Sequence, residues 1–212
     1  MSTKIAVLKE TAPGETRCAA IPETIKKFIA LGATVAVERG AGEQASISDA
    51  DFEAAGATIG DRKSVVGKSG ILLCVQAPEP KSLAGAEPGA LLVGGLDPLG
   101  HRDEIGGYAA SNLDALAMEW MPRITRAQSM DILSSQSNLA GYKAVIDAAA
   151  SYGRAFPMMM TAAGTVSAAK VFVMGVGVAG LQAIATARRL GAQVSATDVR
   201  SATKEQILSL GA

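Results

Sequence analysis

Residues Lys170–Asp198 read KVFVMGVGVAGLQAIATARRLGAQVSATD and carry the strongest structural signal in the chain. The apolar run Lys170–Met174 predicts a strand, Leu181–Leu190 predicts a helix, and Gln193–Thr197 predicts a second strand. A complete GxGxxG motif, Gly175–Gly180, joins the first strand to the helix. Because an acidic residue also ends the second strand, this order predicts a βαβ unit that binds a dinucleotide.

Each glycine of the motif has its own physical role. Gly175 permits the tight turn from strand to helix, and Gly177 lets the backbone approach a pyrophosphate because it has no Cβ atom. Gly180 lets the helix pack close to the strand. The free N–H groups and the dipole at the N-terminus of the helix then face the phosphates.

Asp198 predicts the choice of cofactor. Its carboxylate can accept hydrogen bonds from the adenosine ribose hydroxyls and repels a 2′-phosphate, which favours NAD(H) over NADP(H). Arg200 weakens this inference, since a nearby arginine can pair with a 2′-phosphate. The alternative is a βαβ turn without a ligand, in which Asp198 caps backbone groups.

Composition excludes several other functions. The 212 residues contain 20 basic and 20 acidic side chains, so neither a nucleic-acid groove nor a polybasic membrane anchor is expected. The single histidine, His101, argues against zinc and serine hydrolases, and no metal is expected. Cys18 and Cys74 lie far apart, which predicts reduced, packed thiols. Neither a secretory signal nor a run of roughly 18 apolar residues is apparent, which predicts a cytosolic protein.

Strand and helix patterns alternate along residues 1–125 and predict a first α/β domain with a mostly parallel sheet. A linking helix is expected over 126–153, and 154–212 is expected to begin a second, Rossmann-like domain that this chain leaves incomplete. The expected strands are Lys4–Leu8, Thr34–Glu38, Ile71–Val75, Ala90–Val93 and Leu113–Met118, and the expected helices are Pro22–Leu31 and Asp49–Ala55.

The predicted linking helix carries a polar stripe. At 100° per residue its members fall within about 120° of one another: Gln128, Asp131, Ser134, Ser135 and Asn138. The stripe can meet the nicotinamide end of a dinucleotide, with Gln128 on the carboxamide. Ordinary helix capping and solvation explain it equally well. After the helix, Pro157–Ala169 is expected to be a loop whose three methionines, Met158–Met160, fill gaps in a core or line a cleft.

Two long segments resemble a known family. MPRITRAQSMDILSSQSNLAGYKAVIDAAASYGRAFPMMMTAAGT, together with GVGVAGLQAIATARRLGAQVSATDVRSATKEQ, closely resembles the NAD(H)-binding domain I, the alpha subunit, of proton-translocating NAD(P) transhydrogenases. The opening KETAPGETRCAAIPETIKKFIALGATVAVERGAG also resembles that family, and alanine dehydrogenases share it. The resemblance covers essentially the whole chain and is most specific over Met118–Gln206.

The resemblance implies specific binding residues. The RAQSMD–S cluster implies that Arg123, Gln128, Asp131 and Ser134 contact the nicotinamide half, with Gln128 positioning the ring. The glycine motif and the acidic residue imply adenosine and phosphate contacts. The full implied NAD(H) set is Arg123, Ile124, Thr125, Arg126, Gln128, Asp131, Ser134, Gly175, Gly177, Val178, Gly180, Asp198, Val199 and Arg200.

The resemblance also implies an activity and partners. These are direct hydride transfer between NADH on this chain and NADP⁺ on a separate domain III, a membrane domain II that couples the transfer to proton movement, and a homodimer of this subunit. Domains II and III belong to a beta subunit, and the chain is expected in the cytoplasm, peripheral to the bacterial inner membrane. A complete dinucleotide domain has about six strands, so roughly 150 further residues are expected.

Two other functions remain open. A soluble alanine-type dehydrogenase needs proton transfer, for which that family uses a Lys and a His. This chain has Gln76 and Asp97 in the corresponding stretches, CVQAPEP and GGLDPLG. A truncated, non-catalytic relative that serves as a binding or assembly module is the third possibility.

Overall fold

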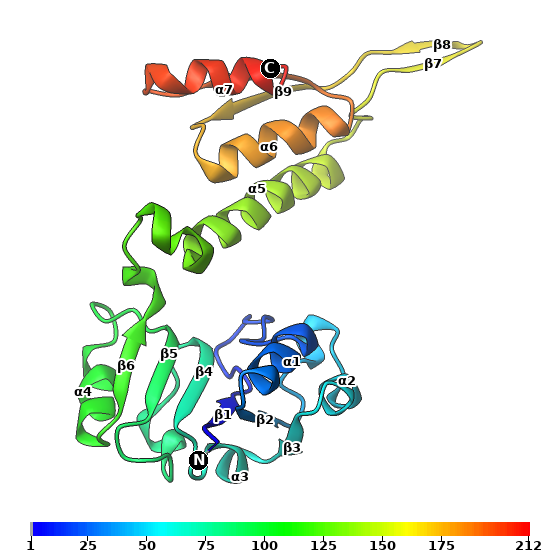
Figure 1. Cartoon of the computed structure of the whole chain (residues 1–212). Helices are drawn as coiled ribbons and strands as arrows, with labels where there is room; N and C mark the ends of the chain where they lie inside the picture. The colour runs from blue at the N-terminus through cyan, green and yellow to red at the C-terminus, as the bar shows by residue number, and fades with distance from the viewer. Residues whose placement is uncertain (1) are drawn as a thin grey trace. The chain divides into compact units, whose positions relative to one another are not determined.

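The computed structural model describes residues 2–212, which divide into two units between Met130 and Asp131 (Figure 1). We call the residues up to Met130 unit 1 and those from Asp131 onward unit 2. No helix within residues 2–212 combines the length and the apolar character that crossing a membrane would need.

Unit 1 is built on a six-stranded sheet in which every neighbouring pair is parallel. The strand order is β3-β2-β1-β4-β5-β6, so the order reverses between β1 and β4. This arrangement confirms the predicted wound α/β domain. The strands are β1 (Lys4–Val7), β2 (Thr34–Glu38), β3 (Thr58–Gly60), β4 (Ile71–Gln76), β5 (Leu91–Gly95) and β6 (Asp114–Ala117).

Helices cover both faces of this sheet. Successive side chains of β1 point into two apolar clusters, one on each face. Ile5 and Val7 of β1 pack in one cluster with residues of two helices, α1 (Pro22–Ala30) and α2 (Asp49–Ala54). Ala6 of β1 packs in the other with residues of α3 (Arg62–Val66) and α4 (Arg102–Ala110). The near-continuous apolar character of the strands follows from this burial on two sides.

Three elements of unit 1 are missing from the sequence prediction: β3, α3 and α4. β3 and α3 are too short, at three and five residues, for a periodic pattern to develop. α4 contains Gly106 and Gly107, which disfavour helix, yet its buried Tyr108 anchors it to the sheet. The 3₁₀ turns of unit 1 are η1 (Glu43–Ala45), η2 (Pro80–Leu83), η3 (Met118–Trp120) and η4 (Thr125–Met130).

Unit 2 contains the predicted βαβ unit. β9 (Lys170–Met174) and β10 (Gln193–Thr197) pair in parallel, and α6 (Val178–Arg189) connects them. A turn η5 (Ser201–Thr203) and α7 (Lys204–Ser209) follow. The core gathers Val145 of α5 (Ile132–Ser151), Val176 and Ile184.

α5 packs on α6 through a close approach of two backbones (Figure 1). A Cβ atom at Gly141 of α5 would lie 2.1 Å from the carbonyl oxygen of Ala179 in α6. The glycine is therefore required for this packing. Through this packing α5 belongs to unit 2, whereas the sequence suggested a separate linking helix.

The start of α5 corrects the predicted polar stripe. The helix begins at Ile132, and Gln128 lies before it in the 3₁₀ turn η4. Gln128 and Asp131 therefore do not share one α-helical face with Ser134. The polar spacing continues across Asp131, but this residue is the N-cap at which the helix starts.

The segment after α5 is also different from the expectation of a loop. It forms an antiparallel hairpin of β7 (Met159–Thr161) and β8 (Gly164–Val166), and Gly164 turns the chain with a φ of 137°. Met158, Met159 and Met160 are exposed, so they do not fill a core in this structure.

Candidate functional site

The turn after β9 has the backbone geometry that its glycines predicted. Gly175 adopts a φ of 91°, and its N–H donates to the Thr197 carbonyl oxygen at 2.8 Å. A Cβ atom at Gly180 would lie 1.9 Å from the Gly175 carbonyl oxygen. The turn and the first part of α6 therefore close on each other only because both positions are glycine.

Gly177 is glycine for a different reason. A Cβ atom at Gly177 would meet no atom of the chain within 4 Å, and the residue is the N-cap of α6. No side chain caps this helix end, and its first turn contains no acidic residue. The open space beside exposed N–H groups fits an anionic group, such as a pyrophosphate, that approaches the backbone.

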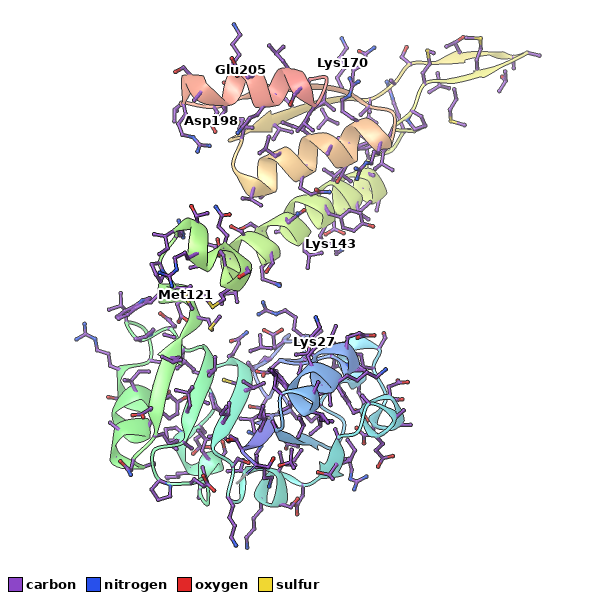
Figure 2. All side chains as sticks on the ribbon, in the orientation of Figure 1. Lys27, Met121, Lys143, Lys170, Asp198 and Glu205 are labelled. Carbon is purple, nitrogen blue, oxygen red and sulfur yellow. The ribbon has the colours of Figure 1, made fainter. Side chains whose placement is uncertain are left out.

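Asp198 follows β10 (Figure 2), and its carboxylate bonds back to this turn. Its Oδ2 accepts a hydrogen bond from the Val176 N–H at 2.7 Å. Arg200 donates to the same carboxylate from its backbone N–H and from its guanidinium. The Arg200 side chain lowers the pKa of Asp198, and the two backbone donors add to this effect, so the group is ionised at neutral pH.

Two of the residues expected to bind the nicotinamide half act as a helix cap in this structure. Asp131 Oδ1 accepts from the N–H groups of Leu133 and Ser134, both at 3.0 Å. Asp131 Oδ2 accepts from the Ser134 hydroxyl at 2.6 Å. This is the capping interpretation that the sequence left open. Since α5 rises about 1.5 Å per residue, Ser134 lies roughly 10 Å along the helix from Gly141.

Arg123 and Gln128, the other two residues expected at the nicotinamide half, belong to unit 1, as do Ile124, Thr125 and Arg126 of the full implied NAD(H) set. Arg123 and Ile124 precede the turn η4, and Thr125, Arg126 and Gln128 lie within it. All five side chains are exposed, while Ala127 of the same turn is buried. The turn therefore presents its polar side chains to solvent and anchors itself through one small apolar residue.

Unit 1 has a cavity of its own, of about 470 Å³. It lies where the strand order reverses, at the carboxyl ends of β1, β2 and β4. In wound α/β sheets this is the usual position of a ligand crevice. Its lining residues are Leu8, Lys9, Glu10, Thr11, Ala12, Glu38, Arg62, Cys74, Gln76, Ala77, Pro78, Glu79 and Ser82.

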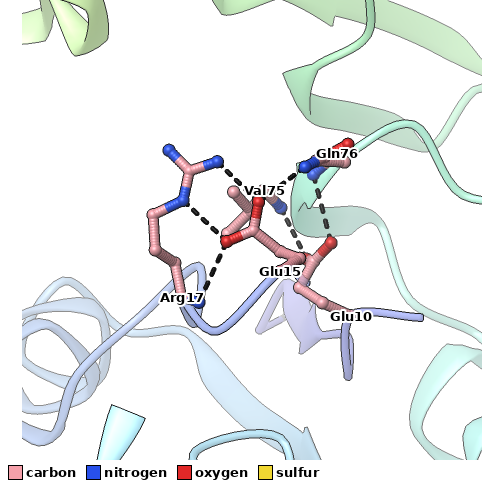
Figure 3. A network of polar contacts seen from close by, with 5 residues as sticks. All are labelled: Glu10, Glu15, Arg17, Val75 and Gln76. Carbon is pink, nitrogen blue, oxygen red and sulfur yellow. Dashed lines mark hydrogen bonds and ion pairs between the residues drawn. The ribbon is translucent and has the colours of Figure 1, made fainter. Parts of the chain in front are cut away.

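A carboxylate network borders this cavity (Figure 3). Glu10 accepts hydrogen bonds from the N–H groups of Val75 and Gln76, and Gln76 donates from its amide to Glu15 at 2.6 Å. Burial raises the pKa of Glu10, although its two backbone donors act in the opposite direction. The network fixes the end of β4 to the loop that follows β1. It joins residues more than 60 positions apart, and no local pattern in the sequence identified it.

The pair Glu15 and Arg17 predicts a measurable dependence on acid. The Arg17 side chain lowers the pKa of Glu15 to about 2. A lowered carboxyl pKa contributes stability above the unfolded pKa, and this contribution is lost as the pH falls through the folded value. Glu15→Gln should therefore flatten the unfolding free energy between about pH 4.5 and pH 2 in acid titrations followed by circular dichroism. Glu23→Gln, on the exposed first turn of α1, is the matched control, and an equal flattening there would contradict the assignment.

Gln76 and Asp97 occupy the positions at which the family resemblance places Lys and His in an alanine dehydrogenase. The Gln76 amide donates to Glu15, and the Asp97 backbone N–H donates to Glu119. Neither side chain is the amine or the imidazole that the resemblance assigns to proton transfer in an alanine dehydrogenase. Within residues 2–212, no group of three or more His, Cys, Asp or Glu side chains could hold a metal ion. Cys18 and Cys74 are free thiols.

Sequence comparison places both units in one family. The model for the alanine dehydrogenase/PNT N-terminal domain matches residues 6–140, and the model for the C-terminal domain matches residues 144–212. The chain is 56% identical to a Rhodospirillum rubrum protein described as the first part of NAD(P) transhydrogenase subunit alpha, over 98% of this chain and 56% of that protein. It is 43% identical to NAD(P) transhydrogenase subunit alpha from Haemophilus influenzae, over 98% of this chain and 40% of that protein.

Structural comparison agrees with this placement. A transhydrogenase from Sinorhizobium meliloti matches with a TM-score of 0.94 and 55% identity, over 98% of this chain and 60% of that chain. An L-alanine dehydrogenase matches with a TM-score of 0.84 and 26% identity, over 99% of this chain and 58% of that chain. The chain thus spans a little over half the length of the Rhodospirillum rubrum protein and of these two solved structures. On the family models and the identities together, the chain belongs to the alanine dehydrogenase/PNT family.

Proposed function

We propose that the chain binds NAD(H) at the turn Gly175–Gly180 and forms the NAD(H)-binding part of a proton-translocating transhydrogenase. The observation that carries the proposal is the open space at Gly177, beside a helix N-terminus that no side chain caps. A tightly closed turn without a ligand would not need glycine at this position. Asp198, ionised and held against the same turn, would receive the adenosine ribose.

The other cofactor contacts follow the residues that the family resemblance implied. Val178 lies at the first helical position of α6, and Val199 and Arg200 flank the adenosine side through their positions after Asp198. Arg123 and Gln128 would hold the nicotinamide half together with Asp131 and Ser134. Ile124, Thr125 and Arg126 are proposed as further cofactor contacts. The cap geometry keeps the Ser134 hydroxyl and the Asp131 carboxylate at the amino end of α5, where a ribose could exchange for the capping bonds.

The chemistry supplied by bound NADH is transfer of a hydride to NADP⁺ on a partner domain. Such a transfer requires positioning and exclusion of water, with no protein acid or base. The residues of this chain therefore bind and orient the donor ring, with Gln128 on the carboxamide. The partners are domain III, which carries NADP(H), a membrane domain II that couples the transfer to proton movement, and a second copy of this chain. The subunit would lie in the cytoplasm against the bacterial inner membrane.

Gln128 gives the kinetic test. Gln128→Ala in the complete enzyme should slow hydride transfer by about tenfold or more and change the NADH dissociation constant by only about twofold, because misorientation costs more than lost binding. Stopped-flow transfer and calorimetric binding measure the two quantities. Gln206→Ala, on the exposed α7, should change neither. Unchanged transfer in Gln128→Ala would remove this residue from its assigned role.

The cavity of unit 1 keeps a second function open, that of an alanine-type dehydrogenase. The same enzyme preparation distinguishes the two. NADH oxidation that depends on pyruvate and ammonia would favour the dehydrogenase, and NADH oxidation that depends on NADP⁺ would favour the transhydrogenase.

A further inference from the structure

The carboxylate of Asp198 is fully occupied by donors of its own chain. Oδ2 accepts from the Val176 N–H at 2.7 Å and from Arg200 Nη2 at 3.0 Å. Oδ1 accepts from the Arg200 backbone N–H at 2.8 Å and from Arg200 Nε at 2.9 Å. A carboxylate offers about four acceptor positions, and four donors fill them. A ribose hydroxyl can bind this group only if one of these donors leaves.

The four donors are not equally easy to displace. Two are backbone N–H groups, fixed by the turn after β9 and by the residues after β10. The other two belong to the guanidinium of Arg200, whose side chain is 60% exposed while that of Asp198 is only 5% exposed. An ion pair with one partner in solvent contributes little, because water replaces its bonds readily. The guanidinium is therefore the donor that a ligand would replace.

We infer that Arg200 is a specificity-determining residue whose guanidinium occupies the place of the adenosine ribose hydroxyls on Asp198 and is displaced when the dinucleotide binds. The inference rests on the proposed binding of NAD(H) at Gly175–Gly180. Because the dinucleotide must displace the guanidinium, each ribose hydroxyl adds less to the binding free energy than it would at an unpaired carboxylate. The chain therefore discriminates less strongly between dinucleotides with and without that hydroxyl. The guanidinium also donates from Nη2 to the Val176 carbonyl oxygen at 3.1 Å, so it covers the turn as well as the acid.

This arrangement differs from one in which Arg200 only braces the loop. If Arg200 only stabilised the shape of the turn, it would affect the binding of every dinucleotide equally. A competitor for Asp198 acts only on ligands that carry the hydroxyl. The coupling between the hydroxyl and Arg200 is therefore the quantity to measure, in the form of a double-mutant cycle.

The experiment compares NADH with its analogue that lacks the adenosine-ribose 2′-hydroxyl, by calorimetry on the full-length protein. In Arg200→Met the ratio of the two dissociation constants, analogue over NADH, should rise about two- to fivefold above that of the unaltered protein, which corresponds to loss of an exposed ion pair. Arg189→Met removes the same charge at the far end of α6 and should leave the ratio unchanged. Melting curves of both variants report whether the fold is retained.

The possible outcomes distinguish the role of Arg200 from the existence of the NAD(H) site. A ratio in Arg200→Met that stays the same or falls, with NADH still bound by the unaltered protein, overturns the role of Arg200 and leaves the binding site in place. Absence of NADH binding by the unaltered protein overturns the site, and the role of Arg200 falls with it.

Discussion

Gly180→Ala is expected to lower the free energy of unfolding of unit 2 by about 3 kcal/mol. The added Cβ atom would stand 1.9 Å from the Gly175 carbonyl oxygen, which is a backbone atom and cannot swing aside. Relief requires that α6 shift away from the turn, and α6 also carries the packing of α5. Hydrogen exchange of the α6 amides measures the effect within unit 2, because two units need not unfold together.

The control for this variant is Gly177→Ala. Its Cβ atom would meet nothing within 4 Å, and the backbone there has no left-handed φ. Replacement of a glycine N-cap by alanine costs only a few tenths of a kcal/mol to about 1 kcal/mol. Equal losses in the two variants would contradict the assignment of Gly180 to packing and Gly177 to open space.

Gly177→Ala is also expected to weaken NADH binding by about 100-fold, although the protein folds normally, because loss of one or two hydrogen bonds to a charged group corresponds to this factor. The methyl group would occupy the space through which the pyrophosphate approaches the backbone N–H groups of α6. Calorimetric titration of NADH measures the change in affinity. Gly153→Ala is the matched control, since its Cβ atom also meets nothing within 4 Å and the residue lies outside the turn.

Retention of full NADH affinity by Gly177→Ala would mean that the open space is not a ligand site. A loss of affinity in Gly153→Ala of the same size would mean that the loss reflects general destabilisation rather than contact with the pyrophosphate.

Local sequence patterns predicted most of this fold because most of its strands and helices have a regular apolar pattern with clear ends. Lys170–Met174 and Gln193–Thr197 appear in the structure with the predicted bounds, since β-branched runs ended by glycine or by an acid have few alternatives. α4 was not predicted because Gly106 and Gly107 have poor helix propensity, and tertiary burial of Tyr108 decides the outcome.

The start of α5 shows the limit of periodicity. The polar pattern continues from Gln128 across Asp131 without a break, so it suggested one continuous helix. The structure instead uses Asp131 as a cap, a role that competes with a helix-interior position for this residue type. The signal for a helix start was present in the sequence, as an Asp immediately before an apolar residue.

The candidate site was predictable in its backbone and not in its side-chain bonding. Gly175, Gly177 and Gly180 follow directly from the motif, and their geometry agrees with it. The bidentate pair between Arg200 and Asp198 depends on side-chain direction, and the sequence indicated Arg200 only as a group that can pair with a 2′-phosphate. The network of Glu10 with the end of β4 depends on strand order, which spacing does not reveal.

Titration of the isotopically labelled protein with NADH, followed through its backbone amide NMR signals, tests the central proposal most directly. We predict saturable shifts that are largest for the N–H groups of Gly177–Gly180, accompanied by shifts at Val176 and Arg200 as the Asp198 bonds rearrange. Shifts confined to the cavity of unit 1, with the amides of Gly175–Gly180 unchanged at saturating NADH, would contradict it.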